Sequence, residues 1–303
     1  MTPNPSDLNP RLTRRGFLAA AGATFAVPWK RRPAERKRNL RKACMFGMVE
    51  GDGSILEKFT LLEDAGFEGI EIDSPSSYDL DEVLAAMAKT GLEIAGTVDS
   101  VHWSQTLSDP DPAVRAQGVA ALKTALRDAK KLRATSVLLV PAVVNAKVSY
   151  ADAWTRSTAE IRKVLPLATE LGVTISIENV WNHFLLSPLE AARYVDQFES
   201  DNVAWHMDLG NVVNYGWPDQ WVAVLGKRIR RLHIKDYSRK KRDEQGLWKG
   251  FDVELGEGDV GWPATMAALD AIGYEGWASA EVAGGGADRL RTVSKQMDAL
   301  FAS

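Results

Sequence analysis

The sequence contains very little cysteine and little histidine, and it has no excess of positive charge. Its single cysteine, Cys44, excludes a disulfide bond within the chain and a cysteine-rich zinc site. The formal net charge is −3 over 303 residues, so no overall positive field would draw the protein to nucleic acid. We therefore expect no nucleic-acid partner.

A long hydrophobic run is also absent, and the sequence therefore predicts no membrane-spanning helix. The apolar residues 17–27 are too few to cross a bilayer. They follow Arg14 and Arg15 in the stretch Thr-Arg-Arg-Gly-Phe-Leu, which resembles a bacterial twin-arginine export signal. We predict a signal and basic linker over residues 1–42, and with it a periplasmic location. No small-residue cleavage site follows and residues 30–42 are strongly basic, so a basic tail on a cytoplasmic protein is the alternative.

Short apolar runs alternate with amphipathic stretches along the rest of the chain. The runs are rich in Val, Ile, Leu and aromatic residues, which is typical of strands buried on both faces. This alternation predicts parallel strands joined by helices. The expected strands cover residues 43–48, 67–72, 92–98, 136–140, 173–177, 203–207, 229–234 and 277–282. The expected helices cover residues 54–65, 80–89, 112–132, 152–171, 188–198, 217–225, 263–272 and 287–301.

These elements predict one domain over residues 43–303, a single (β/α)8 TIM barrel of the α/β class. An open, doubly wound sheet is the alternative. Residues 48–54 lack the glycine spacing of a dinucleotide-binding turn, which argues against that alternative. Polar residues also follow many of the expected strands, whereas an open sheet would gather them at one switch point.

Polar residues at the ends of four expected strands give the strongest functional signal. They are Glu178, Asp208, His233 and Glu281. Each accompanies an apolar run that would gain nothing from a buried charge. A barrel brings these strand ends around one pocket, where three carboxylates would repel one another without a cation. With one imidazole they form a mostly hard ligand set, so we predict one divalent ion: Mn²⁺, Mg²⁺, Co²⁺ or Zn²⁺.

Five short motifs follow one another in a specific order. They are Glu-Asn-Val-Trp-Asn (178–182), Asp-Leu-Gly-Asn (208–211), His-Ile-Lys-Asp (233–236), Gly-Glu-Gly (256–258) and Ala-Glu-Val (280–282). Their order and spacing resemble the xylose isomerase-like sugar isomerase/epimerase superfamily over about residues 43–303. Within it, the pattern is most similar to ketopentose-phosphate 3-epimerases, such as the L-ribulose- and L-xylulose-5-phosphate 3-epimerases. His102 and the stretch 111–115 add to this similarity, and D-tagatose 3-epimerases are more distant relatives.

The resemblance implies that the four strand-end residues bind the metal, and that Glu178 and Glu281 also act as the catalytic acid/base pair. Epimerisation next to a carbonyl needs a proton to leave one face of the substrate and return on the other, which two bases allow. A metal stabilises the enediolate formed between these steps. We therefore expect a metal-dependent isomerase or epimerase of a keto-sugar or sugar phosphate. The residues predicted to bind the sugar are Glu71, His102, Trp181, Asn211, Lys235, Arg239 and Glu257.

Some of these residues have plainer explanations. Glu71 would equally suit an ion pair, and Arg239 begins a charged run over residues 239–242 that suits a solvated loop. Tagatose-type epimerases have a histidine where Asn211 stands, so their substrate contact there is not assumed. The export signal is a further departure, because sugar phosphates are cytoplasmic metabolites. An exported enzyme would instead act on an unphosphorylated keto-sugar or on an oxidised sugar.

Other functions stay open beside the epimerase. An inosose-type dehydratase or a keto-glycoside lyase would begin with the same proton abstraction, so the ligand set does not separate them. A non-catalytic sugar-binding protein would tolerate loss of Glu178 or Glu281, yet both are present. An abasic-site endonuclease needs three zinc ions and many histidine ligands, which four histidines do not supply. The expected partner is a small-molecule sugar, and the formation of a homo-oligomer is left open.

Overall fold

Eight parallel strands close into one barrel in the computed structural model, which describes residues 38–303. Each strand pairs with its neighbours in sequence, and β8 returns to pair with β1, so the sheet has no open edge. The strands are β1 (Leu40–Met45), β2 (Gly69–Ser74), β3 (Glu93–Asp99), β4 (Ser136–Leu139), β5 (Thr174–Glu178), β6 (Val203–Asp208), β7 (Ile229–Ile234) and β8 (Gly276–Ala280). The predicted (β/α)8 barrel is confirmed.

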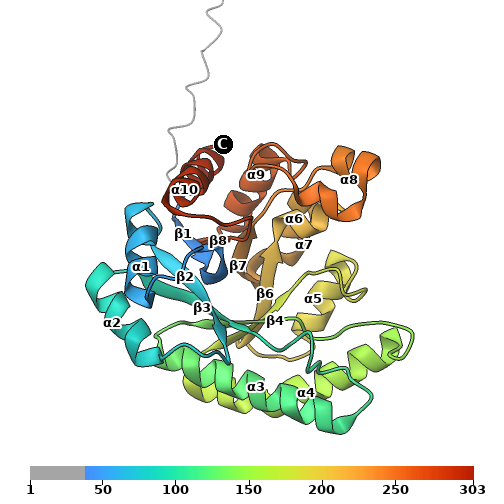
Figure 1. Cartoon of the computed structure of the whole chain (residues 1–303). Helices are drawn as coiled ribbons and strands as arrows, with labels where there is room; N and C mark the ends of the chain where they lie inside the picture. Colours follow the sequence, from blue (N-terminus) through green and yellow to red (C-terminus); the bar gives the residue numbers. More distant parts are fainter. Residues whose placement is uncertain (1–37) are drawn as a thin grey trace, which may run out of the picture. The chain divides into compact units, whose positions relative to one another are not determined.

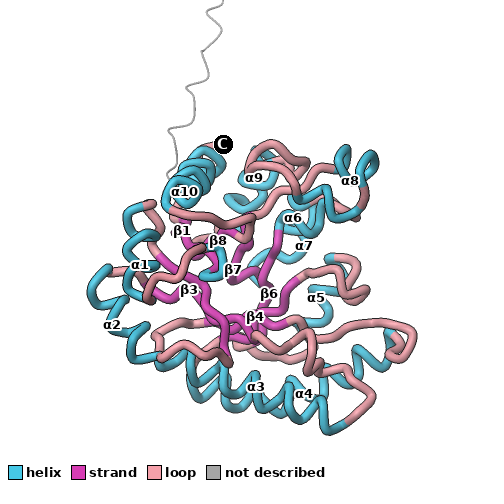
Figure 2. The backbone as a smooth tube through the Cα atoms, viewed as in Figure 1, coloured by secondary structure: helices cyan, strands magenta, loops and turns pink. Residues whose placement is uncertain are grey.

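Helices cover the outside of the strands, as Figures 1 and 2 show. The α-helices are α1 (Ile55–Asp64), α2 (Leu80–Thr90), α3 (Pro112–Lys131), α4 (Tyr150–Leu171), α5 (Pro188–Asp196), α6 (Leu209–Val213), α7 (Pro218–Leu225), α8 (Arg239–Gln245), α9 (Trp262–Ile272) and α10 (Ala287–Phe301). The 3-10 helices are η1 (Phe46–Met48), η2 (Gly226–Arg228) and η3 (Leu247–Phe251). None of the helices within residues 38–303 is long and apolar enough to cross a membrane.

Local sequence signals explain where several helices begin and end. The Ser54 side chain caps α1 by accepting a hydrogen bond from the Glu57 backbone N–H, and the Glu57 carboxylate accepts one from the Ser54 backbone N–H. Gly91 and Gly172 end α2 and α4 in the left-handed conformation, which glycine adopts at little cost. These caps set the length of each helix, and so they fix where the following strand enters the barrel.

The first strand begins earlier than predicted, so the boundary at residue 43 is wrong. β1 starts at Leu40, and residues 40–42, assigned to the basic linker, belong to the barrel. Two of these residues form ion pairs with other parts of the barrel: Arg41 with Glu93 at 2.8 Å, and Lys42 with Asp298 at 2.8 Å. The strand also ends at Met45, because residues 46–48 form the 3-10 helix η1. The predicted twin-arginine signal at Arg14 and Arg15 lies outside the described residues.

Candidate active site

The structure brings the four predicted metal ligands together at the C-terminal ends of β5 to β8. Glu178 and Asp208 are the last residues of β5 and β6, His233 is in β7, and Glu281 directly follows β8. His233 Nδ1 lies 2.9 Å from Glu178 Oε1, 3.1 Å from Glu281 Oε2 and 4.0 Å from Asp208 Oδ2. One ligand atom from each of the four residues lies within 4.8 Å of the others. This geometry fits one cation position.

Two of these carboxylate oxygens are buried without a hydrogen bond, so they are free to bind a cation. Asp208 Oδ2 and Glu281 Oε2 are buried and accept no hydrogen bond of normal geometry. Lys235 Nζ lies 3.1 Å from the first and 2.6 Å from the second, so a positive charge already faces them. Buried carboxylates need such a partner, because an isolated buried charge is very costly. The donor set, three carboxylates and one imidazole, fits a divalent metal ion.

Burial and mutual repulsion shift the acidity of these groups in different directions. Burial raises the pKa of Glu178 to about 7, and it also raises the pKa of Asp208. Burial acts in the same sense on Glu281, but Lys235 and His233 hold the pKa of that carboxyl well below its usual range. Burial opposes a charged His233, yet the neighbouring Glu281 and Glu71 hold its pKa well above its ordinary value. Without a metal, the carboxylates and His233 therefore share protons among themselves. A divalent cation would displace these protons and supply the positive charge instead.

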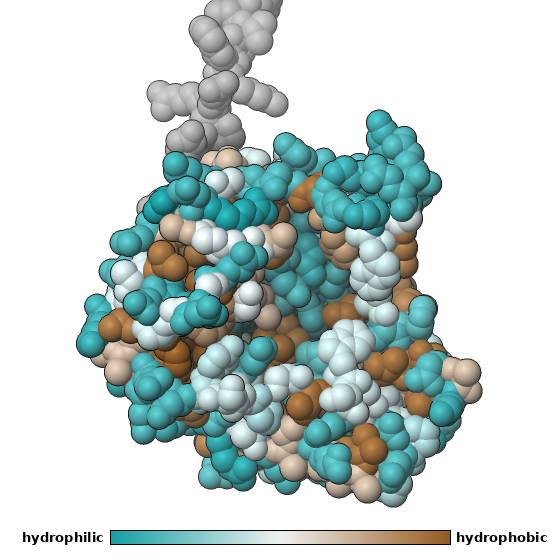
Figure 3. Space-filling view, in the orientation of Figure 1, coloured by the Kyte–Doolittle hydropathy of each residue, from teal (hydrophilic) through white to brown (hydrophobic). Residues whose placement is uncertain are grey.

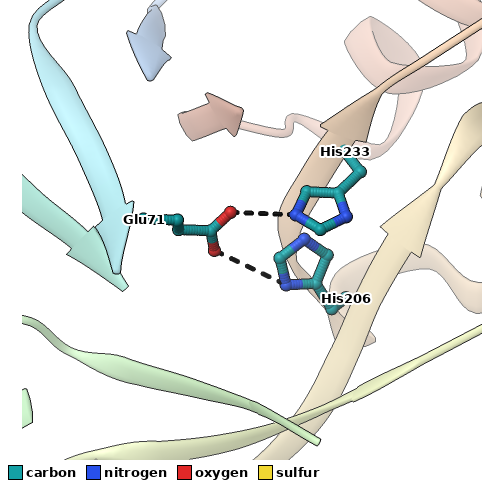
Figure 4. Close-up of side chains that lie close together, drawn as sticks. All are labelled: Glu71, His206 and His233. Carbon is teal, nitrogen blue, oxygen red and sulfur yellow. Dashed lines mark hydrogen bonds and ion pairs between the residues drawn. The ribbon is translucent and has the colours of Figure 1, made fainter. Parts of the chain in front are cut away.

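Glu71 does not line the pocket, so its prediction as a sugar-binding residue is not supported by the structure. The expected strand end was misplaced: β2 continues to Ser74, and Glu71 therefore lies in mid-strand, deeper in the barrel, with 1% of its surface exposed. Its Oε2 atom lies 2.9 Å from His233 Nε2. Figure 4 shows Glu71 facing His233 and His206. His206 Nδ1 is 4.0 Å from Glu71 Oε1, and burial lowers the pKa of His206 well below its ordinary value.

A cavity of about 480 Å³ is lined by three of the four candidate ligands, Glu178, His233 and Glu281. Figure 3 shows one face of the molecule, hollowed near its centre, with hydrophilic residues at depth. Predicted sugar-binding residues on the cavity wall are His102, Trp181, Asn211 and Lys235. The ring of Trp181 lies 5.0 Å from Phe251 and 4.9 Å from Trp248, so aromatic side chains form one wall. Such a wall suits the apolar face of a sugar ring.

His102 presents a defined hydrogen-bonding atom to this cavity. Its Nδ1 atom accepts a hydrogen bond from the backbone N–H of Val140 at 3.4 Å. Burial lowers the pKa of His102 to about 4, so the ring is neutral at pH 7. Since Nδ1 is the acceptor, the single ring proton is on Nε2. His102 therefore has an N–H group available for a substrate oxygen.

Arg239 and Glu257 lie outside the walls of this cavity, against the prediction that they bind the sugar. Arg239 donates to the backbone oxygens of Val213 at 3.1 Å and Gly216 at 2.7 Å, and its guanidinium lies over the ring of Trp217. It ties the start of α8 to the end of α6 and the turn that follows, because its fork of donors matches several carbonyl groups. Glu257 is exposed and borders a neighbouring depression instead.

Two pocket residues, Asp73 and Asp99, were missed in the sequence. Asp73 lies near the end of β2 and Asp99 ends β3, and both line the cavity. Burial raises the pKa of Asp99 to about 7 and also raises the pKa of Asp73. Both follow apolar runs, the same signal that identified Glu178 and Asp208. Each residue directly follows an expected strand, 67–72 or 92–98, just as Glu178 and Asp208 follow theirs, so the signal was present in the sequence but was not used.

The sequence also matches proteins of known families. Residues 59–302 match the family described as "Xylose isomerase-like TIM barrel". An L-ribulose 3-epimerase of Mesorhizobium japonicum is 28% identical over 70% of this chain and 69% of its own length. An L-ribulose-5-phosphate 3-epimerase of Salmonella paratyphi C is 24% identical over 73% of this chain and 79% of its own length.

A solved structure of an L-ribulose 3-epimerase has a similar fold. It superposes with a TM-score of 0.71 and 20% identity, covering 86% of this chain and 94% of that one. These relatives are sugar epimerases, which are isomerases, in agreement with the class of enzyme predicted from the motifs. The predicted superfamily is therefore confirmed.

Proposed function

Because the chain belongs to the xylose isomerase-like TIM barrel family, we propose that it is a metal-dependent epimerase of keto-sugars. The observation that carries this proposal is the position of Glu178 and Glu281. Both carboxylates face His233 Nδ1, at 2.9 and 3.1 Å, and both line the cavity. They come from β5 and from the end of β8, which are not neighbours in the barrel. A substrate in the cavity therefore meets one carboxylate from each of two directions.

Glu178, Asp208, His233 and Glu281 would hold the metal. When bound, a divalent cation supplies electrostatic stabilisation for the negative charge that develops on the substrate oxygens. Glu178 and Glu281 then exchange roles: one takes the proton from the carbon beside the carbonyl, and the other returns a proton to the opposite face.

Other side chains in the cavity would orient the sugar. His102 donates a hydrogen bond from its Nε2–H group to a sugar oxygen, and the aromatic wall around Trp181 packs against the carbon chain or ring. Closing the sugar against these groups excludes water from the reacting carbon, which strengthens the electrostatic interactions there. The binding geometry thus belongs to the chain's own residues, independently of the metal.

We further propose that the natural substrate is unphosphorylated. Within residues 38–303, Lys235 is the one lysine or arginine that lines the cavity, and its ammonium is already paired with Asp208 and Glu281. A phosphate group would also approach Asp73 and Asp99, whose carboxylates repel an anion but accept hydrogen bonds from hydroxyl groups. The chain is similar to both kinds of relative, at 28% identity to the L-ribulose 3-epimerase and 24% to the L-ribulose-5-phosphate 3-epimerase, so the lining of the cavity carries this choice.

Solvent-deuterium exchange read by NMR tests this function. The metal-loaded enzyme is incubated in D₂O with a panel of keto-pentoses, keto-hexoses and their phosphates. We expect deuterium at the carbon beside the carbonyl together with its epimer, and a higher kcat/KM for a free sugar than for its phosphate. Loss of water or cleavage of a glycosidic bond in the product would indicate the dehydratase or lyase instead. Absence of exchange with every sugar would refute the epimerase, and preference for the phosphates would refute only the choice of substrate.

A further inference from the structure

His233 has two ring nitrogens with different surroundings. Nδ1 faces the three other ligand residues, whereas Nε2 faces Glu71 at 2.9 Å on the opposite side of the ring. Glu71 is in β2 and His233 is in β7, with β1 and β8 between them in the barrel. The contact therefore crosses the barrel interior (Figure 4).

The structure makes specific room for the Glu71 carboxylate. Glu71 pairs in register with Gly96, and the β2–β3 ladder has a one-residue shift between Ile70 and Glu71. A Cβ atom on Gly96 would lie 3.1 Å from Glu71 Oε1 and 2.9 Å from the Ser136 hydroxyl, closer than a side chain tolerates without movement. A bulge and a glycine together thus allow a charged side chain to reach His233.

His206, the other neighbour of Glu71, is a poorer hydrogen-bonding partner. Its Nδ1 atom is 4.0 Å from Glu71 Oε1, and neither of its ring nitrogens has a hydrogen bond. The His206 and His233 rings pack with their centres 4.1 Å apart. His206 therefore supports the His233 ring by contact, while Glu71 supplies the hydrogen bond to it.

We propose that Glu71 is a positioning residue of the metal site: it keeps the His233 proton on Nε2 and so presents Nδ1 to the metal. A histidine ligand has one nitrogen for the metal, and the hydrogen bond at the other nitrogen fixes the tautomer and the ring orientation. A carboxylate that accepts from Nε2–H also makes Nδ1 more basic, and so a stronger ligand for the metal. The inference deepens the proposed function, because it rests on the metal site formed by Glu178, Asp208, His233 and Glu281.

The test compares Glu71→Gln and Glu71→Ala with the wild type by calorimetric titration of the metal-free protein with Mn²⁺ and Co²⁺. Glu71→Ala removes the acceptor and should weaken binding by about 10–100-fold. Glu71→Gln keeps an oxygen but loses the charge, so its affinity for the metal should lie between those of the wild type and Glu71→Ala. Glu160→Gln is the matched control. Glu160 is also a buried carboxylate, but it lies in α4 and pairs with Arg115 of α3, so this variant should bind the metal like the wild type.

Two further measurements separate positioning from general damage. In the zinc-loaded protein, ¹⁵N NMR of the His233 ring should show a single tautomer with the proton on Nε2, and Glu71→Ala should lose that signature. Circular dichroism checks the fold, and if Glu71→Ala does not fold, Glu71→Gln carries the test. Wild-type affinity in both variants would overturn the proposal, as would two metal ions per chain in the wild type and one in Glu71→Ala. Failure of the wild type to bind metal would instead refute the proposed metal site.

Discussion

Glu178 and Glu281 are the residues at which the proposed chemistry is most directly testable. Glutamine at either position keeps an oxygen for the metal and removes the base. We expect Glu178→Gln and Glu281→Gln each to lower turnover by about 10²–10⁴-fold, with metal binding weakened but retained. One variant should still exchange the substrate proton with solvent from one face while epimerisation stops. Near-normal epimerisation by both variants with metal bound would rule out the two-base scheme.

Asp99 gives a prediction for the dependence of stability on pH. Burial raises its pKa to about 7, against about 3.9 in an unfolded chain. Between these values the folded state holds a proton that the unfolded state has lost, so the contribution of Asp99 to stability falls as the pH rises. The fall is at most about 1.4 kcal/mol per pH unit and ends above the folded pKa. Asp99→Asn should therefore gain stability relative to the wild type as the pH increases.

Urea unfolding of the metal-free protein at about pH 5 and about pH 8 measures this difference. Asp64→Asn, which changes an exposed residue at the end of α1, is the matched control. Its difference from the wild type should not change between the two pH values. An equal response of both variants would show that burial of Asp99 has no such effect.

The sequence predicted which residues gather at the site better than it predicted what each residue does. Glu178, Asp208 and Glu281 converge as expected because each ends or follows a strand, and a barrel brings such ends together. Glu71 was misassigned because one or two residues of strand length decide whether a carboxylate faces the cavity or the interior. The contacts of Arg239 with two carbonyl groups depend on loop geometry, for which hydrophobic periodicity contains no signal.

Among the structural elements, the segment between β7 and α9 contains one buried side chain, Asp236, that accepts four hydrogen bonds. Its Oδ1 atom accepts from the backbone of Tyr237 at 2.9 Å and Val260 at 3.3 Å. Its Oδ2 atom accepts from the Gly256 backbone and the Trp262 indole, both at 2.9 Å. One buried carboxylate thus organises the chain that carries Trp248 and Phe251 to the pocket wall.

Asp236→Ala should therefore destabilise the protein by at least about 3 kcal/mol, because four donors would lose their acceptor. Urea unfolding measures the change, and limited proteolysis should locate new cleavage in residues 246–261. Asp252→Ala in the same segment removes an exposed carboxylate that pairs with Lys249, and should leave stability nearly unchanged. If both variants unfolded alike, Asp236 would not be the organising residue.

At this scale the strands and long helices were predictable, whereas the short helices were not. A strand buried on both faces shows as a continuous apolar run, and a long helix such as α4 repeats its apolar face over several turns. α6 has five residues and α8 has seven, too few for a hydrophobic face to repeat. The start of α6 depends instead on Asp208, whose side chain accepts from the Asn211 backbone at 2.7 Å. Thus a predicted metal ligand also fixes the turn that follows it.

For the whole molecule, closure of the barrel bears on how the protein would reach its compartment. β1 pairs with both β2 and β8, so the barrel closes only when residues from both ends of the domain are present. The candidate metal ligands come from four different strands or strand ends, and they too require the closed barrel. An export route that carries folded proteins is compatible with such a domain, whereas a route for unfolded chains would require folding and metal binding afterwards. We therefore propose export by the twin-arginine route.

The complete chain tests this proposal when it is expressed in a bacterium with an intact twin-arginine system. Arg14→Lys with Arg15→Lys preserves both positive charges and removes the arginine pair, so the periplasmic fraction should fall sharply while the cytoplasmic fraction rises. Arg31→Lys with Arg32→Lys changes a second arginine pair in the basic stretch and should leave export unchanged. If only general positive charge mattered, both double variants would be exported like the wild type. That outcome, or a wild type found only in the cytoplasm, would refute the proposed route.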